Sequence, residues 1–363
     1  MANHAVGPIR SAPSAAVLGG GRMLGSASCD VLLPSATHAL PAARGLDLIE
    51  HRLRPQALRS GMRVGVVAPS GSTLEPSETT RGIAALKEMG FEVELAAHTS
   101  DIYGHLSGND AVRSSDLLTM LERPDIDAII CLRGGAGAMR TALALDPSRL
   151  NKLRAVQPKA FIGYSDITVI HAVLARALGW VTFYGPMVIS LAHPTDYTLS
   201  AFRRALMATE AFPVEPDPDD PYVETLVAGE AEGELVGGCL TLLATLVGSP
   251  WQPDLRGRIL FFEDVDEEPY AIERYLSQLL AAGLFRGCAG IVIGEHVNCG
   301  PRRPGPTLGL EQVFRDLLKP LGVPTLYHLP IGHGRHIATL PLGARARLDA
   351  TRGTLTVVES GVV

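Results

Sequence analysis

The sequence predicts an α/β fold built on a mostly parallel sheet with helices on both faces. Short apolar runs of strand length alternate with segments whose apolar residues recur at helical spacing. Several of these apolar runs end in a glycine-containing turn. This alternation is typical of parallel strands joined by crossover helices that cover the sheet.

The first half of the chain contains this alternation in order, beginning near Met62. Strands are expected at 64–67, 91–97, within 126–135, at 160–162 and at 181–188. Helices are expected at 80–90, 107–124, 139–145 and 166–178. The helical segments show apolar residues three and four positions apart, which places them on one face of a helix.

The second half has elements of its own, which predicts two domains. Prolines and acidic residues crowd the stretch 191–232, which is typical of a linker. Strand–turn–helix segments are expected at 233–250 and 257–285, strands at 288–296 and 323–334, and a hairpin at 344–359. The predicted organisation is a poorly ordered extension (1–52), an N-terminal domain (53–190), the linker (191–232) and a C-terminal domain (233–363).

Composition excludes several classes of function. The chain has 363 residues, 46% of them hydrophobic and 19% charged, as in a globular protein that folds in water. A net charge of −6 disfavours nucleic acid or an anionic membrane as a partner. Five cysteines without a C-x-x-C pair predict neither a disulfide framework nor a structural zinc site, and favour a reducing, cytoplasmic setting. The longest apolar runs are too short to span a membrane.

The candidate functional residues follow the expected strands, because open α/β sheets carry their chemistry at the carboxyl ends of strands. Ser165 follows the apolar run of "KAFIGYSD" and precedes the helix at 166–178. Its hydroxyl suits either a helix cap or a nucleophile, and these residues alone leave both open. Ser70, between Pro69 and Gly71, is interpreted as a turn residue.

Two further strand ends offer a carboxylate and an imidazole. Glu263 follows the apolar run 259–262, and the acidic residues after it are expected to stabilise the start of the next helix. Their spacing matches no calcium loop. His333 lies between two glycines in "LPIGHGRH", where it could reach a hydroxyl, and His328 and His336 compete with it for the role of a base.

The glycine turn in "LRGGAGAMR" (132–140) could direct backbone N–H groups at an anion. A nucleotide phosphate is one possibility, but the P-loop lysine and the G-x-G-x-x-G spacing are both absent. An oxyanion hole is the other. With it, serine, glutamate and histidine in chain order give the components of a hydrolase triad. The context differs from the G-x-S-x-G elbow, since Ile167 stands where its second glycine would be.

The sequence resembles the LD-carboxypeptidase family, the murein tetrapeptide carboxypeptidases, whose relatives include the microcin-C immunity peptidases. The resemblance covers about residues 53–350. Seven landmarks carry it in order: "RPQALRSGMRVGVVAPSG", "LRGGAGAMR", "FIGYSDITVIHAVL", "FYGPMV", "GGCLTLL", "ILFFEDVDEEPYAIERYLSQL" and "LPIGHG".

The resemblance implies a serine peptidase with Ser165 as nucleophile, His333 as base and Glu263 as the third triad member. It implies oxyanion donors at the backbone N–H groups of Gly135 and Asp166. The implied architecture is a flavodoxin-like N-terminal domain with a smaller, β-rich C-terminal domain, and the site lies between them. Because the family motif places the catalytic acid first, the adjacent Asp264 is expected to cap the following helix.

The implied reaction is hydrolysis of the L,D amide before the terminal D-Ala of a murein tetrapeptide, without a metal or organic cofactor. The alternatives are a microcin-C-immunity-like amidase acting on peptidyl or aminoacyl nucleotides, and a non-catalytic protein that binds wall peptides. A homodimer is expected from the resemblance. Three departures from the family pattern, Ala136, Cys239 and His296, leave the identity of the substrate open.

Overall fold

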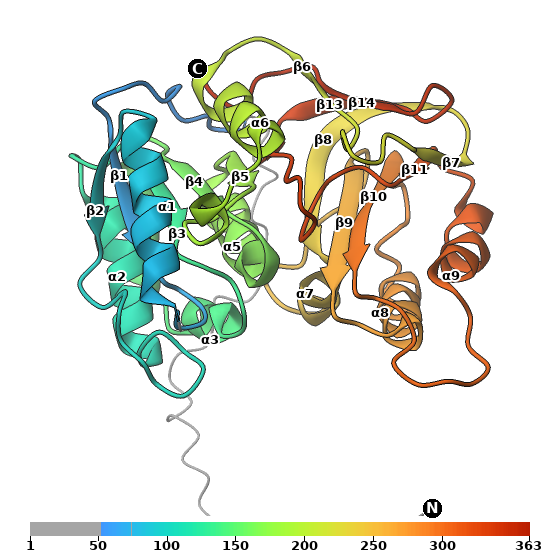
Figure 1. Cartoon of the computed structure of the whole chain (residues 1–363), viewed down its shortest axis with the longest axis horizontal. Helices are drawn as coiled ribbons and strands as arrows, with labels where there is room; N and C mark the ends of the chain where they lie inside the picture. The colour runs from blue at the N-terminus through green and yellow to red at the C-terminus, as the bar shows by residue number, and fades with distance from the viewer. Residues whose placement is uncertain (1–51, 74) are drawn as a thin grey trace, which may run out of the picture. The chain divides into compact units, whose positions relative to one another are not determined.

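The computed structural model describes residues 52–73 and 75–363. The predicted extension, 1–52, lies outside the described residues except for Arg52. The described strands form two sheets, whose strands are labelled in Figure 1. None of the described helices is long and apolar enough to cross a membrane.

The first sheet confirms the predicted flavodoxin-like arrangement. Its order is β12-β5-β4-β3-β1-β2, and β2, β1, β3, β4 and β5 run parallel, in the 2-1-3-4-5 order of flavodoxin-like folds. The strand β12 comes from the far end of the chain and pairs antiparallel with β5. The strands are β1 (Arg63–Val67), β2 (Glu92–Leu95), β3 (Ala128–Cys131), β4 (Ala160–Gly163), β5 (Thr182–Tyr184) and β12 (Leu340–Leu342).

The second sheet is mixed, with the order β6-β14-β13-β8-β9-β10-β11-β7. Its centre, β8 to β11, is parallel, and antiparallel strands flank it on both sides. The predicted C-terminal hairpin is present as β13 and β14. The strands are β6 (Phe212–Val214), β7 (Glu224–Val227), β8 (Glu230–Cys239), β9 (Ile259–Val265), β10 (Gly290–Val297), β11 (Thr325–Tyr327), β13 (Arg345–Asp349) and β14 (Thr354–Val357).

The helices cover these sheets (Figure 1). Residues of α2, α3 and α5 pack on one face of the first sheet, and residues of α1 and α6 pack on the other. Residues of α7, α8 and α9 pack against β9 and β10. The helices are α1 (Pro76–Glu88), α2 (Asp110–Glu122), α3 (Ala138–Leu143), α4 (Pro147–Lys152), α5 (Thr168–Leu178), α6 (Asp196–Met207), α7 (Leu240–Thr245), α8 (Pro269–Ala281) and α9 (Leu310–Leu317).

The strand β9 is buried on both faces, and its side chains divide between two cores. Ile259 and Phe261 belong to the core shared with the first sheet, whereas Leu260 and Phe262 belong to the core under α7, α8 and α9. Successive side chains of a strand point to opposite faces. Glu263 therefore lies on the face toward the first sheet, and Asp264 lies on the face toward α7.

Two stretches differ in detail from the sequence analysis. The predicted linker 191–232 holds α6, β6, β7 and the start of β8, so part of it belongs to the second sheet. The division into domains stays a prediction. Asp264 does not cap the following helix α8. Its carboxylate accepts hydrogen bonds from the N–H (2.9 Å) and hydroxyl (2.8 Å) of Thr241 in the first turn of α7.

Candidate active site

Ser165 occupies a strained turn between β4 and α5. Its φ is 64°, a left-handed conformation that non-glycine residues rarely adopt. A short 3-10 turn begins at the serine itself (Ser165–Ile167) and leads into α5. The Ser165 hydroxyl caps neither helix, and within the described chain it makes no hydrogen bond. Strain of this kind at a polar residue is typical of a functional position rather than a helix cap.

The glycine turn after β3 lies directly against Ser165. A Cβ on Gly134 would stand 2.9 Å from the Ser165 Cβ and 3.0 Å from its Oγ, so only glycine leaves room for the serine side chain. The Gly134 carbonyl accepts a hydrogen bond from Gly71 N–H at 3.2 Å. In a trans peptide the next N–H points the opposite way. The N–H of Gly135 therefore points away from Gly71, and it donates no hydrogen bond within residues 52–73 and 75–363.

Glu263 and His333 meet through a short hydrogen bond. His333 Nδ1 lies 2.6 Å from Glu263 Oε2, and the Glu263 side chain is wholly buried. The other carboxylate oxygen, Oε1, accepts a hydrogen bond from the Tyr184 hydroxyl at 2.6 Å. The same hydroxyl accepts a hydrogen bond from Ser165 N–H at 3.1 Å. Tyr184, at the end of β5, thus connects the serine turn to the carboxylate.

The two glycines that flank His333 leave space for two carboxylates. A Cβ on Gly332 would stand 2.2 Å from Glu263 Oε2, and its φ of 118° is also unfavourable for other residues. A Cβ on Gly334 would overlap the carboxylate of Glu295, at 1.5 Å from Oε2. Gly332 therefore leaves room for the buried Glu263 beside the imidazole, and Gly334 leaves room for Glu295.

Two opposing effects act on the pKa of His333. Burial lowers it, whereas the hydrogen bond and the charge of Glu263 raise it, and the net direction is upward from 6.5. With Nδ1 bonded to Glu263, the other ring nitrogen, Nε2, remains as the proton acceptor. The ring packs against Tyr164 at a centroid distance of 4.9 Å, next to Ser165. The structure places Ser165 and His333 in this common environment but shows no hydrogen bond between them.

The competing histidines have other partners. His336 is buried, and its ring nitrogens lie 3.0 Å from the Thr195 hydroxyl and 3.0 Å from an Asp219 oxygen. His328 stacks on Tyr327 at a centroid distance of 3.7 Å. Neither makes the hydrogen bond to Glu263 that His333 makes.

Asp166 and Ser70 form buried hydrogen bonds next to the serine turn. The Asp166 carboxylate accepts hydrogen bonds from the Ser70 hydroxyl at 2.5 Å and from Ala138 N–H at 2.8 Å, the first residue of α3. Both side chains are buried, and burial raises the pKa of Asp166. Ser70 is therefore more than the turn residue that the sequence indicated. It holds the acid that follows the candidate nucleophile.

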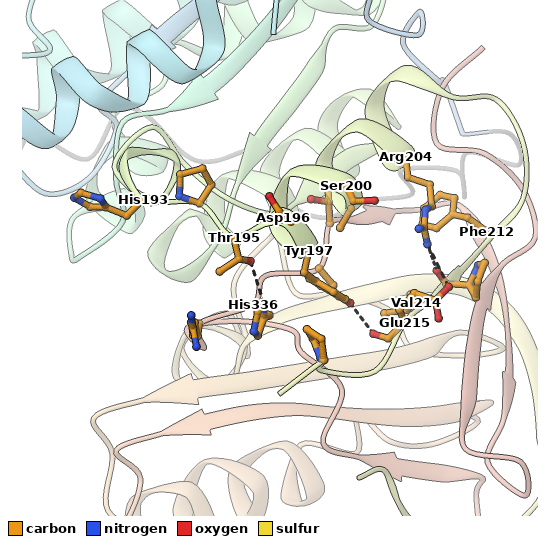
Figure 2. A pocket seen from close by; sticks show the side chains of 17 residues that line it. His193, Thr195, Asp196, Tyr197, Ser200, Arg204, Phe212, Val214, Glu215 and His336 are labelled. Atoms are coloured by element: carbon orange, nitrogen blue, oxygen red, sulfur yellow. Dashed lines mark hydrogen bonds and ion pairs between the residues drawn. The ribbon is translucent and has the colours of Figure 1, made fainter. Parts of the chain in front are cut away.

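A cavity of about 810 Å³ opens beside the His333 turn, between α6 and the loop 335–339. Figure 2 shows His336 and Thr195 on one side of it, and Tyr197 and Glu215 on another. Its lining includes none of the three predicted triad residues. The site chemistry therefore lies outside this cavity, although the chain that carries His333 continues into its wall.

Tyr184 is the residue of the site that the sequence analysis did not single out. It stands in "FYGPMV", one of the seven landmarks, but tyrosine after an apolar run is also ordinary for a buried strand. Its role depends on two contacts, with Ser165 and Glu263, that come from distant parts of the chain.

The fold and the site together indicate a class, the hydrolases in which an acid and a histidine act with a serine at the carboxyl end of a parallel strand. The chain belongs to the LD-carboxypeptidase family. The model of that family's N-terminal domain matches residues 64–185, and the model of its C-terminal domain matches residues 232–348. Membership makes the protein a serine-type hydrolase of the carboxypeptidase kind.

Individual relatives agree with this assignment. A probable murein peptide carboxypeptidase of Bacillus subtilis is 38% identical over 312 residues, which cover 85% of this chain and 95% of the relative. The microcin C7 self-immunity protein MccF of Escherichia coli is 26% identical over 340 residues, with coverages of 85% and 96%. The muramoyltetrapeptide carboxypeptidase of Oxalobacter formigenes is 30% identical, and its crystal structure matches with a TM-score of 0.68 over 81% of this chain and 97% of that one.

Proposed function

We propose that the protein is a serine carboxypeptidase that hydrolyses the L,D amide before the terminal D-Ala of murein tetrapeptides. The observation that carries the proposal is the hydrogen bond from His333 to the fully buried Glu263, beside a serine held at positive φ. The names of the family and of the relatives in Bacillus and Oxalobacter support the substrate class.

In the proposed mechanism Ser165 Oγ attacks the carbonyl carbon of the scissile amide, and its proton passes to His333 Nε2. Glu263 stabilises the imidazolium and keeps Nδ1 protonated. The imidazolium then gives its proton to the amide nitrogen, D-Ala leaves, and an acyl-enzyme remains. Water, deprotonated by His333, attacks this ester and releases the tripeptide and the serine hydroxyl. Each proton taken from a nucleophile returns to a leaving group, so the cycle needs no metal or organic cofactor.

The proposed oxyanion donors are the backbone N–H groups of Gly135 and Asp166. The support for Gly135 is its unbonded N–H in the turn that contacts Ser165. The support for Asp166 is its position directly after the nucleophile, where serine hydrolases commonly place a donor. The Asp166 side chain is held by Ser70 and Ala138, which fixes the orientation of this peptide.

The test is release of D-Ala from a murein tetrapeptide by the purified full chain. The wild-type protein should release D-Ala, and Ser165→Ala should lower turnover by about 10⁴-fold or more while the protein stays folded. Ser277→Ala, an exposed serine on α8, is the matched control and should leave turnover unchanged. A wild-type protein that binds the tetrapeptide without cleaving it would favour a non-catalytic binding protein instead.

The second candidate is an amidase that cleaves peptidyl or aminoacyl nucleotides. A structure of a variant of the microcin C7 self-immunity protein MccF in complex with adenosine monophosphate, at 25% identity, matches the fold with a TM-score of 0.76, and its nucleotide ligand favours keeping this candidate. The two substrates should be offered to the same preparation. Cleavage of an aminoacyl sulfamoyl nucleotide at a higher kcat/KM than the tetrapeptide would replace the first proposal by the second.

We also propose that the protein acts in the cytoplasm as a homodimer. The cytoplasmic setting is supported by Cys131, Cys239, Cys288 and Cys299, which are all buried and free. The homodimer follows from the family resemblance. Light scattering on the purified protein should give twice the chain mass, and a monomer mass at all concentrations would contradict it.

A further inference from the structure

The guanidinium of Arg133 stands beside the serine turn, and no carboxylate of the described residues pairs with it. Arg133 follows β3 directly before the two glycines of the turn. Its Nη1 donates one hydrogen bond, to the Ser72 carbonyl at 3.1 Å. Within residues 52–73 and 75–363, its Nε is buried without any partner, and no ion pair includes it. A partly buried cation whose one hydrogen-bond acceptor is a neutral carbonyl is unusual. Removing a charge from water costs free energy unless a nearby anion compensates for the lost hydration.

The position of this cation relative to the nucleophile is set by the turn itself. Gly134, the next residue, contacts Ser165 Oγ, with a built Cβ at 3.0 Å. A Cβ on Gly135 would stand 3.8 Å from Arg133 Nη2, so the guanidinium lies close to Gly135, the residue that offers the proposed oxyanion donor. Burial raises the pKa of Tyr164, the charge of Arg133 opposes this shift, and Tyr164 packs on His333.

The substrate of the proposed reaction carries an anion that could pair with Arg133. This inference rests on the proposed function. In a carboxypeptidase substrate the leaving residue carries a free carboxylate. Its carboxylate carbon is three bonds from the scissile carbonyl carbon, hence at most about 4 Å away. When that carbonyl is bound at Ser165 and Gly135, the carboxylate must lie close to the turn, on which Arg133 supplies the unpaired cation. Arginine suits this role because its planar fork can donate two hydrogen bonds to one carboxylate.

We propose that Arg133 binds the free C-terminal carboxylate of the substrate and so makes the enzyme specific for the last residue of a peptide. It is a specificity-determining residue rather than a member of the proton-transfer machinery. An amidated C-terminus, which has the same shape but no charge, should therefore be a poor substrate. An internal peptide bond should be poor for the same reason.

The test compares two tetrapeptides that differ only in their C-terminus, D-Ala as the free acid and D-alaninamide. Wild-type protein should favour the acid by about 100-fold in kcat/KM, mostly through KM, as expected for a charge-assisted pair. Arg133→Gln should lose most of this preference by weakening the acid alone. Arg133→Lys keeps the charge but cannot donate two parallel hydrogen bonds, so it should retain part of the preference for the acid. The control is Arg140→Gln, an arginine of the same segment that is exposed and pairs with Asp110.

The outcomes separate this inference from the proposed function. If wild-type protein cleaves acid and amide equally, or Arg133→Gln lowers kcat/KM for both equally, the proposed function is supported but the assignment of Arg133 to the carboxylate is overturned. If wild-type protein cleaves neither, the proposed function fails. Binding of the acid and the amide to Ser165→Ala, by calorimetry, then decides the assignment alone: preference for the acid that Arg133→Gln abolishes supports it, and equal affinity refutes it.

Discussion

The two sheets contribute to the site in different ways. The first sheet supplies Ser165 by a sharp turn at the carboxyl end of β4, where residues of the same sheet determine the geometry. The second supplies Glu263 from within β9, where the carboxylate is fully buried and depends on distant partners. The serine turn is held within the first sheet, by Gly134, by the Ser70–Asp166 hydrogen bond and by Tyr184. The acid needs the core, the His333 turn and Tyr184 to be in place together.

The largest expected effect comes from replacing each of the two adjacent acids of β9 by its amide. Glu263→Gln should lower turnover by about 10⁴-fold, because an amide N–H facing Nδ1 forces the wrong tautomer of His333 and removes the counter-charge. Asp264→Asn should leave turnover near normal and lower stability by about 1 kcal/mol or less, since the Asp264 carboxylate bonds the first turn of α7. Turnover and thermal unfolding of both variants measure this. An inactive Asp264→Asn variant together with an active Glu263→Gln variant would show that Asp264, and not Glu263, is the acid of the triad.

Tyr184→Phe should have the next largest effect. It removes the hydroxyl that joins Ser165 N–H to Glu263 Oε1 and leaves a buried carboxylate oxygen without a donor. We expect a loss of about 1–3 kcal/mol in stability and a roughly 10- to 100-fold loss in kcat with KM little changed. Tyr270→Phe, at an exposed position of α8, is the control. A normal kcat would show that the two halves of the site are aligned without this bridge.

The pH dependence tests the coupling of His333 to Glu263. The base must be neutral, and its pKa is raised above 6.5, so kcat/KM should fall with a midpoint above pH 6.5 as the pH is lowered. In Glu263→Gln the hydrogen bond and the charge of Glu263 are lost, so burial is opposed only by the charges of Asp264 and Asp266, and the midpoint of the residual activity should move down. The sign for stability is opposite: the pair stabilises the fold fully below about pH 6.5, and this contribution is lost as pH rises through the folded pKa. A midpoint below 6.5 in the wild type would contradict the account.

The smallest expected effect concerns Glu295, the other carboxylate against the His333 turn. Its Oε2 is buried and has no hydrogen-bond partner among the described residues, and burial together with the charge of Asp217 raises its pKa to about 7. An acid with a raised pKa costs stability as pH rises from 4.5 through 7. Glu295→Gln should therefore be more stable than wild type near pH 8, by about 1 kcal/mol or less given partial solvent screening, and equal near pH 5. Chemical denaturation at both pH values measures it, with exposed Glu311→Gln as the control. A variant less stable at both would contradict the expectation.

The first sheet could be predicted from sequence because its signals are local. Alternating apolar runs and helical segments predict parallel strands, and the order of those strands follows from the family resemblance. The choice between Glu263 and Asp264 could not be made from the run before them, since β9 is apolar on both faces. The structure separates them because Phe261 faces the first sheet and Phe262 faces α8 and α9. Which face of β9 meets the first sheet depends on packing between segments that are distant in sequence, and the role of Tyr184 depends on such packing too.

Covalent capture of the nucleophile tests the central claim most directly. A peptidyl phosphonate, whose phosphorus takes the place of the scissile carbonyl carbon, should be incubated with the full chain and the adduct located by peptide mass mapping. The account predicts one adduct, on Ser165, formed far more slowly in Glu263→Gln and at the normal rate in Asp264→Asn. An adduct on another residue, or modification of Ser165 at the same rate in both variants, would contradict a nucleophile on the first sheet activated by an acid and a base from the second.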